Sequence, residues 1–359
     1  MKSGAYFGEL RSLLNHKASV RTWNALWRAL DRWDPDHLSE VAMPYVSSHL
    51  ECWPDHLRTS PARWLDRRLD GAHVPTWPLV RVLEINGRVL SMALVDRIAR
   101  ELLDHPITGL NARNIHVGAK EMQELMSSER MRHVRALDLS KTQLDCECVF
   151  SIAASTNLAS VQRLNLSGCR LGNEGVRYLT QSMYLDSLTE LTLQDARIGQ
   201  WAFEDLGEAE FAEQLRTLDV SDNHLGKRGA SALAGNGALE ELETLILRNC
   251  DLGDEGVEAL CRGACFENLR VLNLEYNSIR NTGAVALARS GLLRNVRELR
   301  LGSNRIGHQG LRALVEQGQM RHLEVLHFNY NPLSQQAQEI LDDVPFEVDV
   351  DTTTFKEQA

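Results

Sequence analysis

Apolar residues recur along most of the chain with a fixed period of 27 residues. Segments such as LETLILRNCDL, from Leu242, and LRVLNLEYNSI, from Leu269, align without a gap, and the same step extends from Val80 to Leu323. The first, fourth and sixth positions of each segment are apolar, which is typical of a short strand with one buried face. A leucine at position 19 marks the inward face of a helix. A fixed period of this length predicts a solenoid of about ten strand–helix units over residues 80–349.

Polar and small residues inside the unit indicate how its turns are built. Position 9 is Asn or Cys in six units, and an inward amide there can satisfy turn backbone groups that are costly to bury. Glycine at position 12 lets the chain leave the strand, and glycine at position 15 is expected to let helix and strand approach. Helices are wider than the strand spacing of ~4.8 Å, so we expect the array to bend with its strands on the concave side. The residues at position 9 are Cys169, Asn223, Cys250, Asn277, Asn304 and Asn331.

Residues 1–79 differ from the rest because they hold six of the seven tryptophans. Apolar residues from Val20 to Trp33 recur at three- and four-residue steps, which predicts an amphipathic helix that ends at Asp34 and Pro35. Further helices are predicted over 36–46 and 61–69. The aromatic cluster fits either a ligand pocket or a small helical core that covers the open end of the solenoid. We favour the core, because large aromatic side chains mostly serve packing.

The C-terminal end of the repeat region also departs from the period. A helix is predicted over 334–343, and Phe346, Val348 and Val350 then alternate with polar residues like a final edge strand. The predicted organisation is therefore a helical cap over residues 1–79, a solenoid over 80–349, and an edge with a loose tail over 350–359.

The pattern LxxLxLxxNxLGxxGxxxL over residues 80–349 resembles the leucine-rich repeats of the ribonuclease-inhibitor-like class. That class also includes the repeats of the Ran GTPase-activating protein and of intracellular nucleotide-binding immune receptors. The resemblance implies an α/β horseshoe with a parallel sheet on the concave side and helices on the convex side. Residues 1–79 resemble no family that we recognise.

Composition narrows the possible partners and the compartment. The formal net charge is −10, and an acidic solenoid repels a phosphate backbone, so no nucleic-acid partner is expected. No uncharged apolar run approaches the ~20 residues of a membrane span, and the N-terminus lacks a signal-peptide pattern. Seven irregularly spaced cysteines do not form a disulfide framework. These features predict a cytoplasmic protein with reduced thiols and no membrane partner.

Motifs that carry chemistry are few. The DCEC sequence at 145–148 lacks the paired CxxC spacing of a zinc site, and we interpret it as the start of a helix with one thiol inward. Cys261 and Cys265 lie four residues apart on a predicted helix, a spacing that favours packing. No phosphate-binding glycine loop or catalytic triad is indicated. We therefore predict no metal, no cofactor and no catalytic residue.

Two further features belong to the fifth of the ten units, which starts at Leu188. An acidic run is expected on its convex helix, where a solvated helix face is a simpler interpretation than a docking site for a basic partner. Trp201 is expected to open that helix with a partly exposed contact. The acidic residues are Glu204, Asp205, Glu208, Glu210 and Glu213.

The concave face carries the candidate binding site, because positions 5, 7 and 8 are expected to point away from the core. Its middle is acidic, and its C-terminal third brings tyrosine and arginine, the residue types that become binding hot spots on rigid surfaces. The alternative is that these are scattered surface residues without a partner. We call the candidate set the concave patch: Asp195, Asp219, Asp222, Ile246, Arg248, Glu275, Tyr276, Arg300, His327 and Tyr330.

The leading functional prediction is a non-enzymatic scaffold that binds a protein partner through the concave face. The alternative is a regulator that accelerates GTP hydrolysis by a small GTPase, as the Ran-activating relative does. That alternative rests on fold analogy alone, and none of that relative's functional residues maps onto this chain. A ligase like the bacterial leucine-rich-repeat effectors is disfavoured, because only about ten residues follow the solenoid. The partner's identity and the oligomeric state are left open by the sequence.

Overall fold

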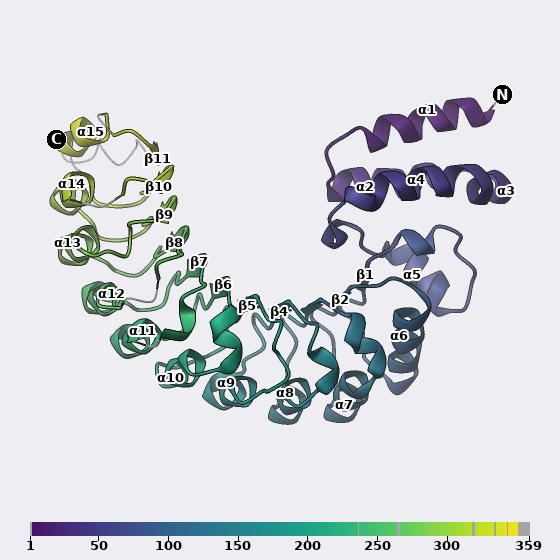
Figure 1. Ribbon diagram of the computed structural model, residues 1–359, viewed down its shortest axis with the longest axis horizontal. Coiled ribbons are helices and arrows are strands. Elements are labelled where there is room, and N and C mark those ends of the chain that lie inside the picture. The colour runs from purple at the N-terminus through teal and green to yellow at the C-terminus, as the bar shows by residue number, and fades with distance from the viewer. Residues whose placement is uncertain are drawn as a thin grey trace.

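The computed structural model describes residues 2–235, 237–263, 266–317, 320–333, 335–342 and 344–350. Within these residues the strands form one parallel sheet of eleven strands, ordered along the sheet as they are along the chain. The chain bends into an arc with the strands on its inner side and the helices on its outer side (Figure 1). The predicted horseshoe is confirmed.

Each strand is three residues long, and its neighbours are set by the repeat. Leu245 lies opposite Leu218 on one side and Leu272 on the other, which is a step of 27 residues in both directions. The strands are β1 Val82–Glu84, β2 Gly109–Asn111, β3 Ala136–Asp138, β4 Arg163–Asn165, β5 Glu190–Thr192, β6 Thr217–Asp219, β7 Thr244–Ile246, β8 Val271–Asn273, β9 Glu298–Arg300, β10 Val325–His327 and β11 Glu347–Asp349.

One helix follows each of the first ten strands on the convex side. The leucine of position 19 is fully buried in most of these helices, as Leu260 and Leu287 illustrate. The helices are α6 Met92–Asp104, α7 Ala119–Ser127, α8 Cys146–Ala153, α9 Gly172–Thr180, α10 Ala202–Gly207, α11 Gly226–Gly235, α12 Gly253–Cys261, α13 Asn281–Arg289, α14 His308–Gln317 and α15 Gln335–Asp342.

The N-terminal helices continue the arc beyond β1 (Figure 1). The predicted helices over 20–33, 36–46 and 61–69 are present, the first of them ending earlier, at Leu30, and the second interrupted by one turn of π-helix. A further helix precedes them that the hydrophobic spacing did not indicate. The helices are α1 Lys2–Leu14, α2 Val20–Leu30, α3 Pro35–His37, α4 Met43–His49 and α5 Ala62–Leu69.

Tryptophans attach these helices to the first strand. The indole N–H of Trp23 donates a hydrogen bond to the carbonyl of Thr59 (2.8 Å), and Thr59 pairs in parallel with Val82 of β1. The buried Arg58 donates from Nε to the carbonyl of Leu79 (2.9 Å). Most of the aromatic cluster is therefore a packed core against the open edge of the sheet, in agreement with the packing interpretation.

A ladder of buried asparagines runs through the turns after the strands. Nδ2 of Asn277 donates to the carbonyls of Leu247 (2.6 Å) and Glu275 (3.0 Å). Its Oδ1 accepts from the backbone N–H of Cys250 (2.9 Å) in the preceding unit. Where cysteine replaces asparagine, Sγ of Cys250 still reaches a backbone carbonyl, that of Val220 (3.3 Å). The predicted role of position 9 is confirmed, and these bonds join consecutive units.

The glycines of position 15 act differently from the prediction. A Cβ on Gly229 would lie 2.6 Å from the side chain of Leu225 and 3.0 Å from that of Phe203 on α10. A Cβ on Gly175 would lie 2.9 Å from Cβ of Leu171. The small residue therefore makes room for the apolar side chain of position 11 and, at Gly229, also for the preceding helix, and not for the strand.

The predicted edge strand is present as β11, which pairs in parallel with β10. Its register breaks the period, because Val325 lies opposite Glu347, 22 residues on. The tail predicted to be loose within 350–359 lies, from residue 351 on, outside the described residues, as do Ser334 and residue 343 at the ends of the predicted last helix. No helix among the described residues is both long and apolar enough to cross a membrane.

Candidate functional site on the concave face

The concave face begins where each strand ends, at position 5. Oδ1 of Asp219 accepts a hydrogen bond from the backbone N–H of Ser221 (2.9 Å), two residues further on. This side-chain turn ends the strand and uses part of the carboxylate's acceptor capacity. Asp219 therefore has a structural role within the concave patch. The same bond is made by Asp138, Asn165 and Asn273.

Position 8 has a left-handed backbone in every unit, with φ between 48° and 69°. Its N–H still continues the ladder, as when Asp222 donates to the carbonyl of Arg248 (2.8 Å). Glycine adopts this conformation freely and Asn or Asp tolerates it, whereas bulky side chains rarely do. Tyr276 and Tyr330 adopt it nevertheless, and their side chains are 48% and 65% exposed. The ten residues are Gly87, Asn114, Lys141, Gly168, Asp195, Asp222, Asn249, Tyr276, Ser303 and Tyr330.

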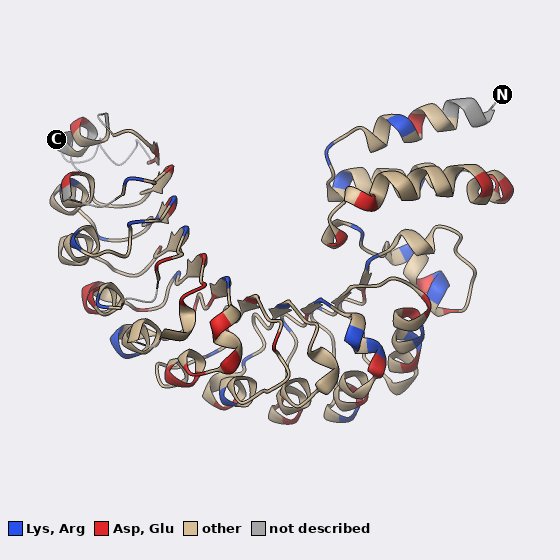
Figure 2. Cartoon of the chain, viewed as in Figure 1, with Lys and Arg blue, Asp and Glu red and all other residues tan. Residues whose placement is uncertain are grey.

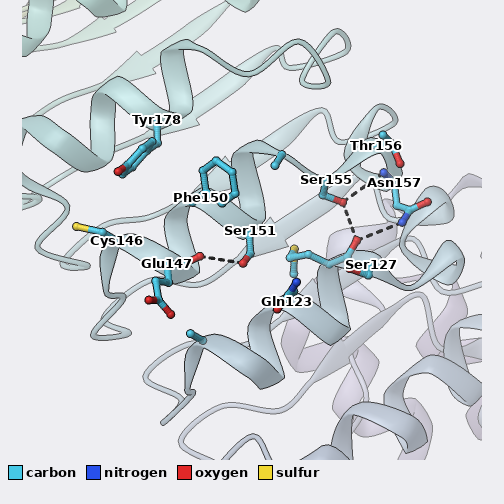
Figure 3. A pocket seen from close by; sticks show the side chains of 13 residues that line it. Gln123, Ser127, Cys146, Glu147, Phe150, Ser151, Ser155, Thr156, Asn157 and Tyr178 are labelled. Carbon is cyan, nitrogen blue, oxygen red and sulfur yellow. Dashed lines mark hydrogen bonds between the residues drawn. The ribbon is translucent and has the colours of Figure 1, made fainter.

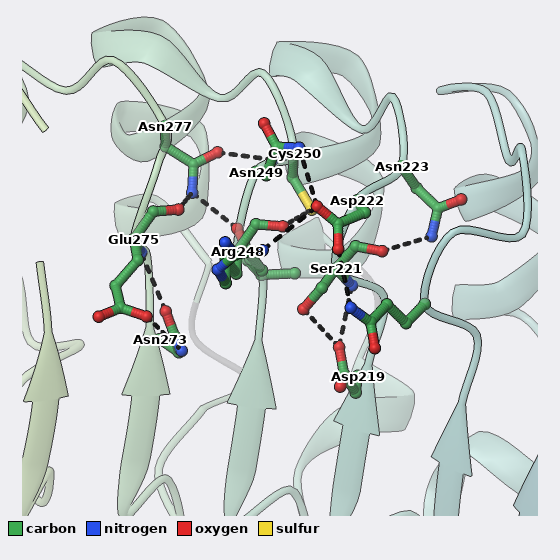
Figure 4. A network of polar contacts seen from close by, with 12 residues as sticks. Asp219, Ser221, Asp222, Asn223, Arg248, Asn249, Cys250, Asn273, Glu275 and Asn277 are labelled. Atoms are coloured by element: carbon green, nitrogen blue, oxygen red, sulfur yellow. Dashed lines mark hydrogen bonds and ion pairs between the residues drawn. The ribbon is translucent and has the colours of Figure 1, made fainter. Parts of the chain in front are cut away.

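A polar network links four consecutive units at the middle of the concave patch (Figure 4). Asp222 accepts hydrogen bonds from Nε2 of Gln194 and from Nδ2 of Asn249, both at 2.8 Å. Arg248 lies 3.4 Å from the same carboxylate, and its guanidinium carbon lies 4.4 Å from the centre of the Tyr276 ring. Burial raises the pKa of Asp222, but the bonds from Gln194 and Asn249 and the charge of Arg248 outweigh it, so the pKa is lowered. The carboxylate is therefore held in its charged form.

A second cluster of charged side chains lies at the C-terminal end of the concave face. Nε of Arg300 donates to Oε1 of Glu298 (2.6 Å) on the same strand. His327 lies between two acids, with Nε2 3.4 Å from Glu298 and Nδ1 3.0 Å from Asp349. Hydrogen bonds from Asn329 and His327 lower the pKa of Asp349. Arg300 and His327 are thus brought together, and the acids that join them were not among the predicted residues.

The remaining members of the concave patch have separate surroundings. Asp195 is exposed, and Ile246 is half-buried on β7 between Asp219 and Asn273 in register. Oε2 of Glu275 accepts from Nδ2 of Asn273 (3.2 Å). The three acids of the middle therefore do not act as one group, because Asp219 bonds to its own turn and Asp222 to Arg248.

Sequence reasoning missed the contribution of position 3. A strand presents alternate residues to one face, so positions 3 and 5 both lie on the concave side. This rule would have identified Glu298, Glu190 and Arg163 as concave residues from the sequence. In the N-terminal third, position 3 is small (Gly109 and Ala136), and a shallow hollow of about 260 Å³ lies over β1–β5. Charged residues of both signs line the inner edge of the sheet (Figure 2).

The other motifs have structural roles. Asp145 accepts from the N–H of Cys148 (2.8 Å) and so caps α8, with Cys148 buried and Cys146 exposed, as interpreted from the sequence. Burial raises the pKa of the Cys148 thiol to about 12. Helix α12 ends at Cys261, and Cys265, its predicted partner on a shared face, lies outside the described residues. Among the described residues, no three His, Cys, Asp or Glu side chains form a group that could hold a metal ion.

The structure of the fifth unit, which starts at Leu188, differs from one expectation. Helix α10 ends at Gly207, so Glu208 is its C-cap, and Glu210 and Glu213 lie on the following 3₁₀ turn and not on the helix. Trp201 caps the helix as expected and is largely exposed, with the Arg228 guanidinium stacked over its ring.

Comparison with known proteins supports the repeat assignment. A family model described as "Leucine Rich repeat" matches residues 157–179, 214–234, 241–261, 267–288 and 293–315. No curated protein sequence matches the chain significantly.

Similar solved structures include the Rad7–Elc1 complex of yeast, with a TM-score of 0.49 and 15% identity over 93% of this chain and 92% of the other. A Bacteroides fragilis protein matches with a TM-score of 0.39 and 14% identity over 90% and 84%. The TLR13–ssRNA13 complex matches with a TM-score of 0.46 and 19% identity over 75% and 38%. The matched segments show that this chain contains leucine-rich repeats, and the strand–turn–helix unit continues in the same register on both sides of them.

Proposed function

We propose that the protein is a non-enzymatic scaffold that binds a protein partner through the concave patch. The observation that carries the proposal is the pair of tyrosines at position 8. A left-handed backbone costs a non-glycine residue about 1–2 kcal/mol, and Tyr276 and Tyr330 recover little of this by burial, since both side chains are exposed. A large aromatic ring kept at such a position has value when it contacts another molecule.

The surroundings of the tyrosines also favour binding. Arg248 is held by Asp222 and by the ring of Tyr276, and Arg300 is held by Glu298. Side chains fixed before binding lose less conformational entropy when a partner arrives. The patch therefore offers arginine and tyrosine in an ordered arrangement on a rigid sheet.

The test compares partner recovery by the native chain and by the triple variant Tyr276→Ala, Arg300→Ala, Tyr330→Ala. Affinity purification followed by mass spectrometry identifies the partner, and circular dichroism confirms that the two proteins are folded alike. Ser303→Ala, at the same left-handed position between the two tyrosines, is the matched control. We expect the triple variant to lose the partner and the control to keep it. Equal recovery by the triple variant and the native chain contradicts the proposal.

The same experiment addresses the alternative function. If the recovered partner is a small GTPase, single-turnover GTP hydrolysis with and without the protein distinguishes a regulator from a scaffold. A scaffold leaves the hydrolysis rate unchanged, whereas a GTPase-activating regulator raises it.

A further inference from the structure

The convex face carries an exposed aromatic side chain at a position where most other units have a polar residue. Phe150 occupies position 17 of its unit, on α8, and its side chain is 57% exposed. A packing role does not account for a phenylalanine on the outer side of a helix. Other units place mostly polar or charged residues at this position: Asp96, Gln123, Arg177, Glu204, Ser231, Glu258, Val285, Arg312 and Glu339.

Phe150 forms one wall of a groove between α7 and α8 with a volume of about 530 Å³ (Figure 3). Tyr178 of α9 meets the Phe150 ring edge-on, with ring centroids 5.8 Å apart. Met126 lines the groove from the side of α7, and the small Ala119 and Ala154 leave it open.

Three of the polar side chains inside the groove, Ser151, Ser155 and Asn157, donate hydrogen bonds to backbone carbonyls. The hydroxyl of Ser155 and the amide of Asn157 both donate to the carbonyl of Met126, at 2.6 Å and 3.2 Å. The hydroxyl of Ser151 donates to the carbonyl of Glu147 (2.8 Å). The groove therefore offers a ligand polar and apolar surface in similar amounts, and the exposed ring of Phe150 is its largest apolar element.

The rim of the groove is acidic. Glu147 lines it and is exposed, and Glu174 lies beside it, within reach of the Tyr178 hydroxyl (3.4 Å). Of the cations on the same helices, Arg177 lies 3.9 Å from Glu174 and offsets part of its charge, and Lys120 on α7 is exposed. A second copy of this chain would bring like charges together at this rim, whereas a basic partner would be attracted.

We propose that this convex groove docks a basic amphipathic helix of another protein. One large aliphatic side chain of that helix enters between Met126 and Phe150, and its lysine or arginine side chains reach Glu147 and Glu174. A helix that lays its apolar face into a groove is a common mode of peptide recognition. The site is separate from the concave patch, so the protein can hold two partners at once.

Two exposed thiols provide the test. Cys146 lines the groove, and Cys52 is exposed in the N-terminal region. The native chain is alkylated at pH 8.5 with a synthetic 18-residue Leu–Lys amphipathic helix present or absent, and mass spectrometry follows each cysteine. We expect the peptide to slow alkylation of Cys146 at least fivefold and to leave Cys52 unchanged. A Leu–Glu peptide of the same pattern is expected to protect neither thiol.

Variants separate the apolar and the charged contributions. Phe150→Ser is expected to abolish the protection of Cys146, and Glu147→Gln with Glu174→Gln to weaken it severalfold. Val285→Ser, at the same repeat position on α13, is the matched control and is expected to keep full protection. The proposal is overturned if Cys146 is not protected, if Cys52 is protected equally, if the Leu–Glu peptide works as well, or if Phe150→Ser changes nothing. Circular dichroism of each variant excludes unfolding as the cause of a loss.

Discussion

The guanidinium carbon of Arg248 lies 4.4 Å from the centre of the Tyr276 ring, which belongs to the next unit of the repeat. The contact joins two concave side chains across neighbouring strands, and Asp222 holds the same guanidinium from the preceding unit. Residues of three consecutive units thereby meet at the guanidinium of Arg248. A substitution of Arg248 or Tyr276 consequently changes both the stability of this contact and the surface proposed to bind a partner.

A double-mutant cycle measures that coupling. Arg248→Ala, Tyr276→Ala and the double variant are compared with the native chain by urea denaturation. Because a cation over a partly exposed ring contributes about 0.5–1 kcal/mol, we expect a coupling free energy of that size. Strictly additive effects of the two substitutions would show that the stacking contributes nothing.

Tyr330→Asn is expected to stabilise the fold while it weakens partner binding. Asparagine tolerates the left-handed backbone at position 8 better than tyrosine does, and the exposed ring of Tyr330 leaves little packing to lose. The free energy of unfolding should rise by up to about 1 kcal/mol. Thermal and urea unfolding provide the measurement, and a drop in stability contradicts the expected strain.

Asn277→Ala should destabilise the repeat strongly. The substitution leaves the carbonyl of Leu247 and the N–H of Cys250 without their partner in the buried turn. Unpaired buried groups cost about 1–3 kcal/mol each, so a loss of roughly 2–6 kcal/mol is expected in urea denaturation.

Asn277→Cys is the informative companion variant. A thiol at this position can still reach a carbonyl, as that of Cys250 does, but it replaces only part of the amide's bonds. Its loss of stability should be intermediate. A cysteine variant as unstable as the alanine variant would mean that the thiol contact has no stabilising effect.

A pH-dependent term is expected where the N-terminal helices meet the first repeat helix. Nη2 of Arg68 donates to Nε2 of His105 (3.0 Å), which requires a neutral ring nitrogen. Burial lowers the pKa of His105 below its ordinary value of 6.5, with Arg68 acting in the same direction and Glu101 and Asp104 opposing. The unfolded chain therefore binds the proton more readily. This contribution to stability is complete above about pH 6.5 and is lost as the pH falls below it.

Urea unfolding at pH 7.5 and at pH 5.5 tests this expectation. The native chain should be less stable at the lower pH, and His105→Gln should lose part of that difference. The same pH dependence in both proteins would assign it to other groups.

The repeat made the interior of this protein readable from its sequence. Leu272 and Asn277 have equivalents 27 residues away in several units, so the sequence shows several times which residue types each position accepts. Their burial could therefore be predicted, and both are buried. The bonds of Arg300 and His327 were not readable in this way. They depend on side-chain rotamers and on Asp349 of β11, a strand whose register leaves the period.

The backbone of position 8 was hidden for a different reason. Glycine at 87 and 168 and asparagine at 114 and 249 suit a left-handed turn. The two tyrosines and Lys141 at the same position do not favour this backbone, so the sequence did not indicate it. Phe150, in contrast, stands out once its own register is tabulated. Its departure from the mostly polar residues of position 17 was present in the sequence, and the groove beside it required coordinates.

The column of left-handed residues at position 8 combines a fixed backbone with variable side chains. From Gly87 to Ser303, each of these residues donates its backbone N–H to a carbonyl of the next unit, so the side chain can change while the hydrogen bond stays. Exchanging residues along this single column can thus remodel the concave surface without redesign of the interior.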